Sequence, residues 1–157
     1  MMGRVFVLDA SVAAKWFLQD EPDTIPALAL KEEWDAGRLE FHVPAVFHGE
    51  ACQLLAKACG RRDAATRSPR LSKHEALECI EQLYGWAFHV AELTKERSQA
   101  ALVLSTLWSK RFYDMTYLAL AEELDCRWIT ADEKVLASSP PGFPAHGVLL
   151  LSALALK

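Results

Sequence analysis

VFVLDASVAAKWFLQDE, residues 5–21, is the stretch of sequence that decides the fold. With Arg4 it begins as a short run, residues 4–8, that is almost continuously apolar and rich in β-branched and aromatic side chains. Such a run predicts a strand buried on both faces, as in a parallel sheet. Asp9 ends the run, and Ser11 is predicted to cap a helix over residues 12–18. The stretch thus predicts a strand that leads directly into a helix, with an acid at the junction.

The same alternation of strands and helices continues along the chain. Further strands are predicted over residues 39–43, 87–91, 127–130 and 148–151. Helices are predicted over residues 24–36, 45–59, 73–85, 95–108 and 114–124, with a short one after residue 132. Gly37 and Gly60 are expected to end two of them, and Ser72 with Glu75 forms an S-x-x-E capping box. The alternation predicts an α/β domain with a mostly parallel sheet of about five strands.

Length and composition agree with a soluble globular protein. The chain has 157 residues, 52% of them hydrophobic and 24% charged, so we expect one domain over residues 1–157. The four cysteines lack CxxC spacing and the five histidines are scattered, so no zinc site is predicted and the thiols are expected to be free. Neither a signal peptide nor a membrane span is recognisable, which predicts a cytoplasmic protein.

The charge balance neither favours nor excludes a nucleic-acid partner. The chain carries 17 basic and 21 acidic residues, for a net charge of −4. A basic segment between residues 57 and 73 is interpreted either as a solvated loop or as a binding site for RNA phosphates. Its cations are Lys57, Arg61, Arg62, Arg67, Arg70 and Lys73. The cations expected to border an acidic site are Lys15, Lys110, Arg111 and Lys134.

Four acids occupy positions that a parallel sheet brings together. Asp9 and Asp132 follow predicted strands, whereas Glu50 and Asp114 lie near the starts of predicted helices. Ligands of open α/β sheets bind beyond the carboxyl ends of the strands, near a topological switch point. Several carboxylates there repel one another unless a hard cation such as Mg²⁺ or Mn²⁺ binds them. The alternatives are local: Asp9, Asp114 and Asp132 could serve only helix starts, and Glu50 a solvent face.

Four short sequence motifs around these acids resemble those of the PIN-domain family, and within it those of the VapC-type toxins of toxin–antitoxin pairs. They are VFVLDASVAAKWFLQDE, VPAVFHGEACQLL, YDMTYLALAEEL and ITADEKVL, around residues 9, 50, 114 and 132. The resemblance implies an α/β/α sandwich on a parallel sheet. It also implies that Asp9, Glu50, Asp114 and Asp132 are the acidic metal-binding positions. Gln53 and Met115 depart from the residues that the family often has.

The resemblance further implies what the chain does. It points to a ribonuclease that uses one or two Mg²⁺ or Mn²⁺ ions to hydrolyse RNA, leaving 5′-phosphate and 3′-hydroxyl ends. Ser11 and Thr130 match polar positions beside the acids and are expected to hold a ligand oxygen or a water. A protein antitoxin that covers the site and a homodimer are also implied. Apart from the resemblance, we expect Trp16, Phe17, Trp86, Trp108 and Trp128 to lie mostly in the core, although Trp16 or Phe112 could stack on a base.

Three alternatives share parts of this pattern. A PIN nuclease of RNA maturation would carry the same motifs without a toxin role. A phosphohydrolase of haloacid-dehalogenase type also has an acid after its first strand, but it uses D-x-D, whereas this chain has Asp9-Ala10-Ser11. The last alternative is a catalytically silent binding module, against which the presence of all four acids argues.

Overall fold

A five-stranded sheet forms the centre of the protein. The structure is a computed structural model, and it describes residues 3–60 and 65–154. All neighbouring strands pair in parallel, in the order β3-β2-β1-β4-β5. The strands are β1 (Arg4–Leu8), β2 (Leu39–Pro44), β3 (His89–Ala91), β4 (Arg127–Thr130) and β5 (Val148–Leu150). The predicted α/β class and parallel sheet are confirmed, with β3 and β5 shorter than expected.

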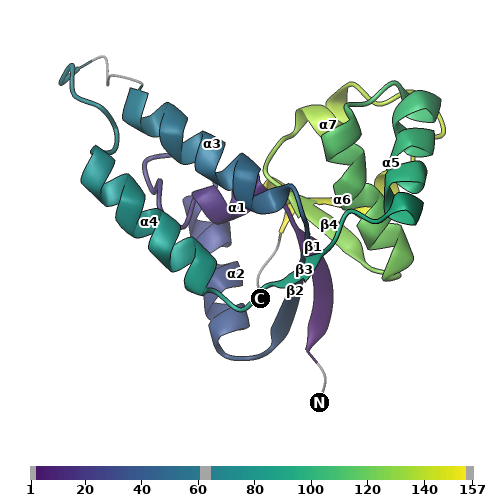
Figure 1. Cartoon of the computed structure of the whole chain (residues 1–157), viewed down its shortest axis with the longest axis horizontal. Helices are drawn as coiled ribbons and strands as arrows, with labels where there is room; N and C mark the ends of the chain where they lie inside the picture. Colours follow the sequence, from purple (N-terminus) through teal and green to yellow (C-terminus); the bar gives the residue numbers. More distant parts are fainter. Residues whose placement is uncertain (1–2, 61–64, 155–157) are drawn as a thin grey trace.

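Helices cover both faces of the sheet and complete three layers. In Figure 1, α1 to α4 lie on one side of the strands, and α5, α6 and α7 lie on the other. The helices are α1 (Ala10–Ala14), α2 (Thr24–Asp35), α3 (Phe47–Gly60), α4 (Lys73–Gly85), α5 (Lys95–Trp108), α6 (Phe112–Glu123) and α7 (Lys134–Ala137). Two 3₁₀ turns, Ala145–Gly147 and Leu151–Ala153, flank β5. Among the described residues, no helix is long and apolar enough to cross a membrane.

An aromatic cluster joins α1 and α2 to the sheet. The Trp16 ring stacks on Trp34 with centroids 5.8 Å apart and meets Trp86 edge-on at 5.1 Å. Its indole N–H donates to the carbonyl of Ala27 at 2.7 Å, so the one polar atom of this buried ring is satisfied. The prediction that Trp16 belongs to the core is confirmed, and the alternative that it stacks on a base is wrong. Phe112 is partly buried and packs against the core.

Helix α6 is buried along most of its length. Every residue from Met115 to Ala121 is buried, because the helix lies between the sheet and α5. A helix with apolar residues all round is expected where both sides are covered. This placement fixes the first turn of α6, with Asp114, against the carboxyl ends of the strands.

The start of α1 differs from the sequence prediction. Asp9, rather than Ser11, is the N-cap, and its Oδ1 accepts a hydrogen bond from the Ser11 amide at 2.8 Å. The helix also ends at Ala14, earlier than predicted. Because β1 stops at Leu8, the chain turns at once, and the residue at the turn supplies the cap. The capping box of Ser72 and Glu75 is confirmed.

The strand order creates a switch point between β1 and β4. The chain runs from β1 outward to β2 and β3, and then returns to place β4 on the other side of β1. The two strands stay joined beyond the ladder, because the Asp9 amide donates to the carbonyl of Ile129 at 2.9 Å. Crevices at such points are the usual ligand sites of parallel sheets.

Candidate functional site

The four predicted acids line one pocket at the switch point. Its volume is about 290 Å³, and its walls come from the ends of β1 and β4, from the starts of α1 and α6, and from α3 along most of its length. Ser11 lines the same pocket, whereas Thr130 is fully buried beside it. The acids that line it are Asp9, Glu50, Asp114 and Asp132.

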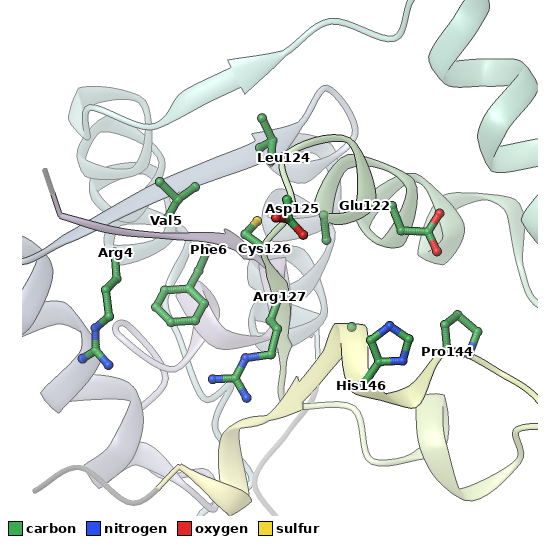
Figure 2. A pocket seen from close by; sticks show the side chains of 12 residues that line it. Arg4, Val5, Phe6, Glu122, Leu124, Asp125, Cys126, Arg127, Pro144 and His146 are labelled. Carbon is green, nitrogen blue, oxygen red and sulfur yellow. The ribbon is translucent and has the colours of Figure 1, made fainter.

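A larger cavity lies at the opposite end of the same strands. It has a volume of about 680 Å³ and lies at the amino ends of β1 and β4 (Figure 2). Its lining mixes Arg4, Arg127 and His146 with Glu122 and Asp125. None of the predicted site residues reaches it. Volume alone therefore does not identify the functional site, and the acid pocket is the candidate.

Asp9 is held by two hydrogen bonds at the base of the pocket. Besides the bond to the Ser11 amide, its Oδ2 accepts from the indole N–H of Trp128 at 2.9 Å. Burial raises the pKa of Asp9, and these hydrogen bonds oppose that rise. The alternative that Asp9 serves a helix start is thus correct, because the residue caps α1. Its second oxygen is nevertheless oriented by a tryptophan far away in the sequence.

Glu50 is oriented by a tyrosine from α6. The Tyr117 hydroxyl donates to Glu50 Oε2 at 2.5 Å, and the Tyr117 ring stacks on Trp128 at 5.6 Å. Burial raises the pKa of Glu50, and the charges of Asp9 and Asp114 raise it further. Burial likewise raises the pKa of Tyr117 well above its usual value, so its hydroxyl keeps the proton that it donates. Glu50 therefore faces the pocket and is only partly exposed.

Asp114 is paired with an exposed arginine. Arg111 Nε lies 3.1 Å from Asp114 Oδ2, and Nη2 lies 3.4 Å from Oδ1. The Arg111 side chain is 79% exposed, whereas that of Asp114 is 23% exposed. An exposed ion pair of this kind contributes little stability, so the guanidinium can move away at small cost. Arg111 thus supplies a removable positive charge at the mouth of the pocket.

Hydrogen bonds shape the loop after β4 and connect it to α1. Thr130 Oγ1 accepts from the Asp132 amide at 3.1 Å, and Asp132 Oδ1 accepts from the Lys134 amide at 3.0 Å. Ser11 Oγ accepts from the Ala131 amide at 3.1 Å and so connects this loop to α1. Asp132 therefore stabilises the turn before α7, which is the local role that the sequence offered as an alternative. It also lines the pocket.

The predicted basic border of the pocket is only partly present. Arg111 lines it, and so does Lys57 from the last turn of α3. Lys15 instead pairs with Glu21 at 3.1 Å, and Lys110 donates to the carbonyl of Val135 at 2.9 Å. Lys134 borders an adjoining recess. Of the basic segment, Arg70 pairs with Asp20 and Glu21, and Arg61 and Arg62 lie outside the described residues.

The donor set of the pocket fits a hard divalent cation. All four acids offer carboxylate oxygens, and burial disfavours the charge of Asp9 and Glu50 when no cation is near. Over residues 3–60 and 65–154, no three of these acids bring ligand atoms within 4.8 Å of one another. The pocket is therefore wide enough for water molecules to share the coordination of an ion.

Trp128 and Tyr117 belong to the site but were not predicted. Each carries a signal that sequence reasoning could have used. Tyr117 follows Asp114 by three residues on one helix, which places both on the same side. Trp128 precedes Thr130 by two residues on one strand, so both side chains lie on the same face. Their partners, however, depend on packing between distant segments.

Comparisons with known proteins agree with this geometry. Residues 6–138 match the family model for the PIN domain. This range contains all four acids together with Ser11 and Thr130. Among curated proteins, no sequence matches at a significant level.

Several solved structures share the fold. A toxin–antitoxin complex from Klebsiella pneumoniae superposes with a TM-score of 0.59 at 14% identity, covering 92% of this chain and 96% of its own. A protein from Pyrobaculum aerophilum gives a TM-score of 0.62 at 20% identity, covering 95% and 85%. VapC20 from Mycobacterium tuberculosis, a toxin that cleaves the sarcin–ricin loop, gives 0.59 at 18% identity, covering 85% and 94%. At these identities the likeness shows the fold alone.

The raised pKa of Glu50 predicts a pH-dependent stability. In the folded metal-free protein, the Glu50 carboxyl binds its proton more tightly than it does in the unfolded chain. The free energy of unfolding therefore falls as the pH rises from below 4.5, the ordinary pKa of Glu, through the raised pKa of Glu50. Glu50→Gln removes this penalty and keeps an acceptor for Tyr117. In EDTA at pH 7, urea denaturation should find Glu50→Gln more stable than wild type, with the gain shrinking toward pH 4. Glu96→Gln, at an exposed site, is the control. A less stable Glu50→Gln at pH 7 would contradict the burial argument.

Proposed function

The chain belongs to the PIN domain family, and on that premise we propose that it is a metal-dependent endoribonuclease. The observation that carries the proposal is the convergence of Asp9, Glu50, Asp114 and Asp132 on one pocket at the switch point of a parallel sheet. Family membership removes the dehalogenase alternative. We further propose that residues 1–157 form one domain that works in the cytoplasm.

The acids would hold Mg²⁺ or Mn²⁺, one ion or two. Asp9, Glu50 and Asp114 are proposed as direct ligands, and Asp132 as a ligand through water. When bound, the ion supplies positive charge against the phosphodiester and lowers the pKa of a water molecule. Trp128 and Tyr117 orient the Asp9 and Glu50 carboxylates in the pocket that the ion would enter.

The chain's own cations would hold the RNA backbone. Arg111 can leave Asp114 for a phosphate once the ion neutralises the acids, because its side chain is largely exposed. Lys57 lines the pocket from the opposite helix, α3. Ser11 and Thr130 keep the loop after β4 in register with α1, which holds Asp132 at the pocket. They are proposed to orient a water or substrate oxygen there.

The acids and the metal are tested together. Purified protein should cleave RNA with Mg²⁺ or Mn²⁺, and EDTA should stop the reaction reversibly. Asp9→Asn and Asp114→Asn should each lower kcat at least about 100-fold, more than the loss of an outer-shell partner. Asp35→Asn, which changes an exposed acid paired with Lys31, should retain full activity. Activity in EDTA equal to that in Mg²⁺ would refute the metal mechanism, and no cleavage with any metal would favour the silent binding module.

Trp128 offers a test of how Asp9 is positioned. Trp128→Phe keeps a ring against Tyr117 but removes the N–H that binds Asp9, so Mg²⁺ affinity should fall about 10–100-fold. The affinity is measured from the dependence of cleavage rate on Mg²⁺ concentration. Trp108→Phe is a matched control, because the Trp108 N–H is buried without a hydrogen-bond partner among the described residues. An equal loss of Mg²⁺ affinity in both variants would indicate that the effect comes from packing and not from the position of Asp9.

Lys57 offers a test of RNA contact. Lys57→Ala should weaken binding of uncleaved RNA to the Asp114→Asn protein and reduce the slope of log K against log salt by roughly 0.7–0.9. Lys95→Ala, an exposed lysine beside Glu96 on α5, should leave the slope unchanged. Fluorescence anisotropy over a salt series gives both values. An unchanged slope in Lys57→Ala would exclude a phosphate contact.

We also propose that this nuclease is the toxin of a VapBC-type pair. Structures of its fold include toxin–antitoxin complexes from Klebsiella pneumoniae and Rickettsia felis, the latter bound to promoter DNA. An antitoxin Arg or Lys is well suited to the acid pocket, in the position that Arg111 takes here. Exposed apolar side chains on α4 and α5 support protein partners, including a second copy of the chain. They are Leu77, Tyr84, Leu102, Val103 and Leu107.

Expression in bacterial cells separates the toxin from an RNA-maturation nuclease. The wild-type chain alone should arrest growth, and co-expression of a small neighbouring gene product should restore it. The Asp114→Asn chain should be harmless at equal abundance. Normal growth with an active nuclease would favour the maturation role, and light scattering of the purified chain would report the homodimer.

A further inference from the structure

A cluster of metal-binding side chains lies on the sheet, apart from the acid pocket. Glu40 and His42 stand two residues apart on β2 and so project from the same face. His89, the first residue of β3, pairs in register with His42. Phe41, which lies between Glu40 and His42 on β2, points to the opposite face and joins the aromatic cluster. None of the three cluster residues lines the acid pocket.

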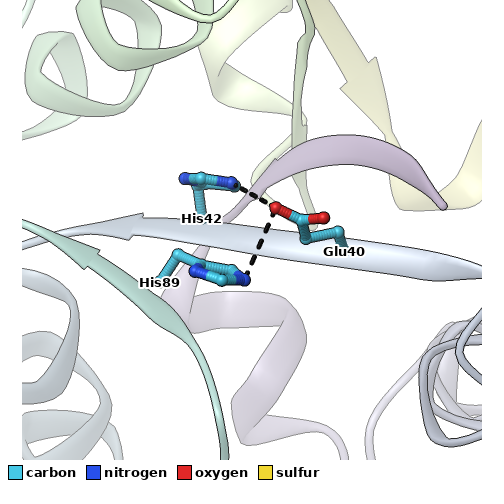
Figure 3. Close-up of side chains that lie close together, drawn as sticks. All are labelled: Glu40, His42 and His89. Atoms are coloured by element: carbon cyan, nitrogen blue, oxygen red, sulfur yellow. Dashed lines mark hydrogen bonds and ion pairs between the residues drawn. The ribbon is translucent and has the colours of Figure 1, made fainter. Parts of the chain in front are cut away.

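The three side chains converge on one point. His42 Nε2 lies 2.9 Å from Glu40 Oε1, and His89 Nε2 lies 3.4 Å from the same oxygen. The two imidazole rings stack with centroids 4.6 Å apart. Figure 3 shows both rings directing a nitrogen at the carboxylate. The potential ligand atoms all lie within 4.8 Å of one another.

These distances match those between ligands of a tetrahedral ion. Donors bound to Zn²⁺ at about 2.0–2.1 Å lie roughly 3.3 Å from each other. The two His–Glu separations, 2.9 and 3.4 Å, bracket that value, and reorientation of the two rings would direct both nitrogens at a shared ion. Two imidazoles and one carboxylate suit zinc, nickel or copper better than magnesium.

An ordinary ion pair accounts for this arrangement less well. One carboxylate pairs naturally with one imidazolium, but here a second ring stacks on the first. Protonating both rings would place two like charges face to face. A metal ion binds both rings in their neutral form and removes that conflict. The His89 side chain is 57% exposed, which leaves an entry path and room for a water ligand.

We propose that Glu40, His42 and His89 form a second metal site, for a borderline divalent ion such as Zn²⁺, that ties β3 to β2. Strand β3 is a three-residue edge strand, and such short strands have few ladder hydrogen bonds to hold them. A shared ion adds a side-chain link across the pair. This site is independent of the proposed nuclease activity, since it shares no residue with the acid pocket.

The test is isothermal titration calorimetry with Zn²⁺ alone at pH 7.5. The Asp114→Asn chain serves as the parent, so that the acid pocket contributes little. It should bind one Zn²⁺ per chain, and adding His42→Gln or His89→Gln should lower the affinity at least about tenfold. His74→Gln, which changes an exposed histidine paired with Glu78, should leave binding unchanged. Cobalt absorption spectra of the same variants should show tetrahedral coordination that both histidine changes abolish.

Several outcomes would overturn the proposal. They are an absence of Zn²⁺ binding by the parent, and equal binding by the parent and both histidine variants. Circular dichroism checks folding, and His89→Gln, at the more exposed position, decides the matter if His42→Gln fails to fold. Hydrogen exchange supplies a second readout: Zn²⁺ should slow the amides of Val90 and Ala91 in the parent but not in His89→Gln. RNA cleavage with Mg²⁺ by His89→Gln should equal that of wild type.

Discussion

The partly buried Asp9 carboxylate is the constraint around which the site is organised. Its pKa is raised by burial, and its two oxygens are satisfied by an amide at the start of α1 and by the indole of Trp128 on β4. An unsatisfied buried charge would be costly, so these donors and the neighbouring acids form one unit. Because the donors come from β4 and α1, the acid also fixes how the two central strands meet at the switch point.

Helix α6 connects the residues that hold Asp9 to Glu50. Its buried middle packs against the strands, and Tyr117 both stacks on Trp128 and binds Glu50. The chain thus links Asp9 and Glu50 through two stacked aromatic rings. Asp114, at the start of the same helix, remains near the surface and pairs with Arg111. The pocket therefore has a rigid base and a mouth whose positive charge can be replaced.

Two kinds of donor set are separated on one sheet. Beyond the carboxyl ends of β1 and β4, carboxylate donors surround a pocket of about 290 Å³, and oxygen is the ligand that hard cations prefer. On β2 and β3, two nitrogens and one oxygen converge tightly, as borderline ions prefer. The first arrangement arises from the ends of strands and helices, and the second from the register of a parallel pair.

Local patterns in the sequence determined much of the fold. Apolar runs predicted the parallel strands, Ser72 with Glu75 predicted a helix start, and strand-end acids predicted the pocket. These features depend on neighbours within a few residues, which a sequence displays directly. The structure decided between Ser11 and Asp9 as the cap of α1, because the end of β1 sets that turn. It also paired Trp128 with Asp9 and aligned His89 with His42, two histidines that are far apart in the sequence. Such contacts follow from strand register and helix packing, which bring together residues that are far apart in the chain.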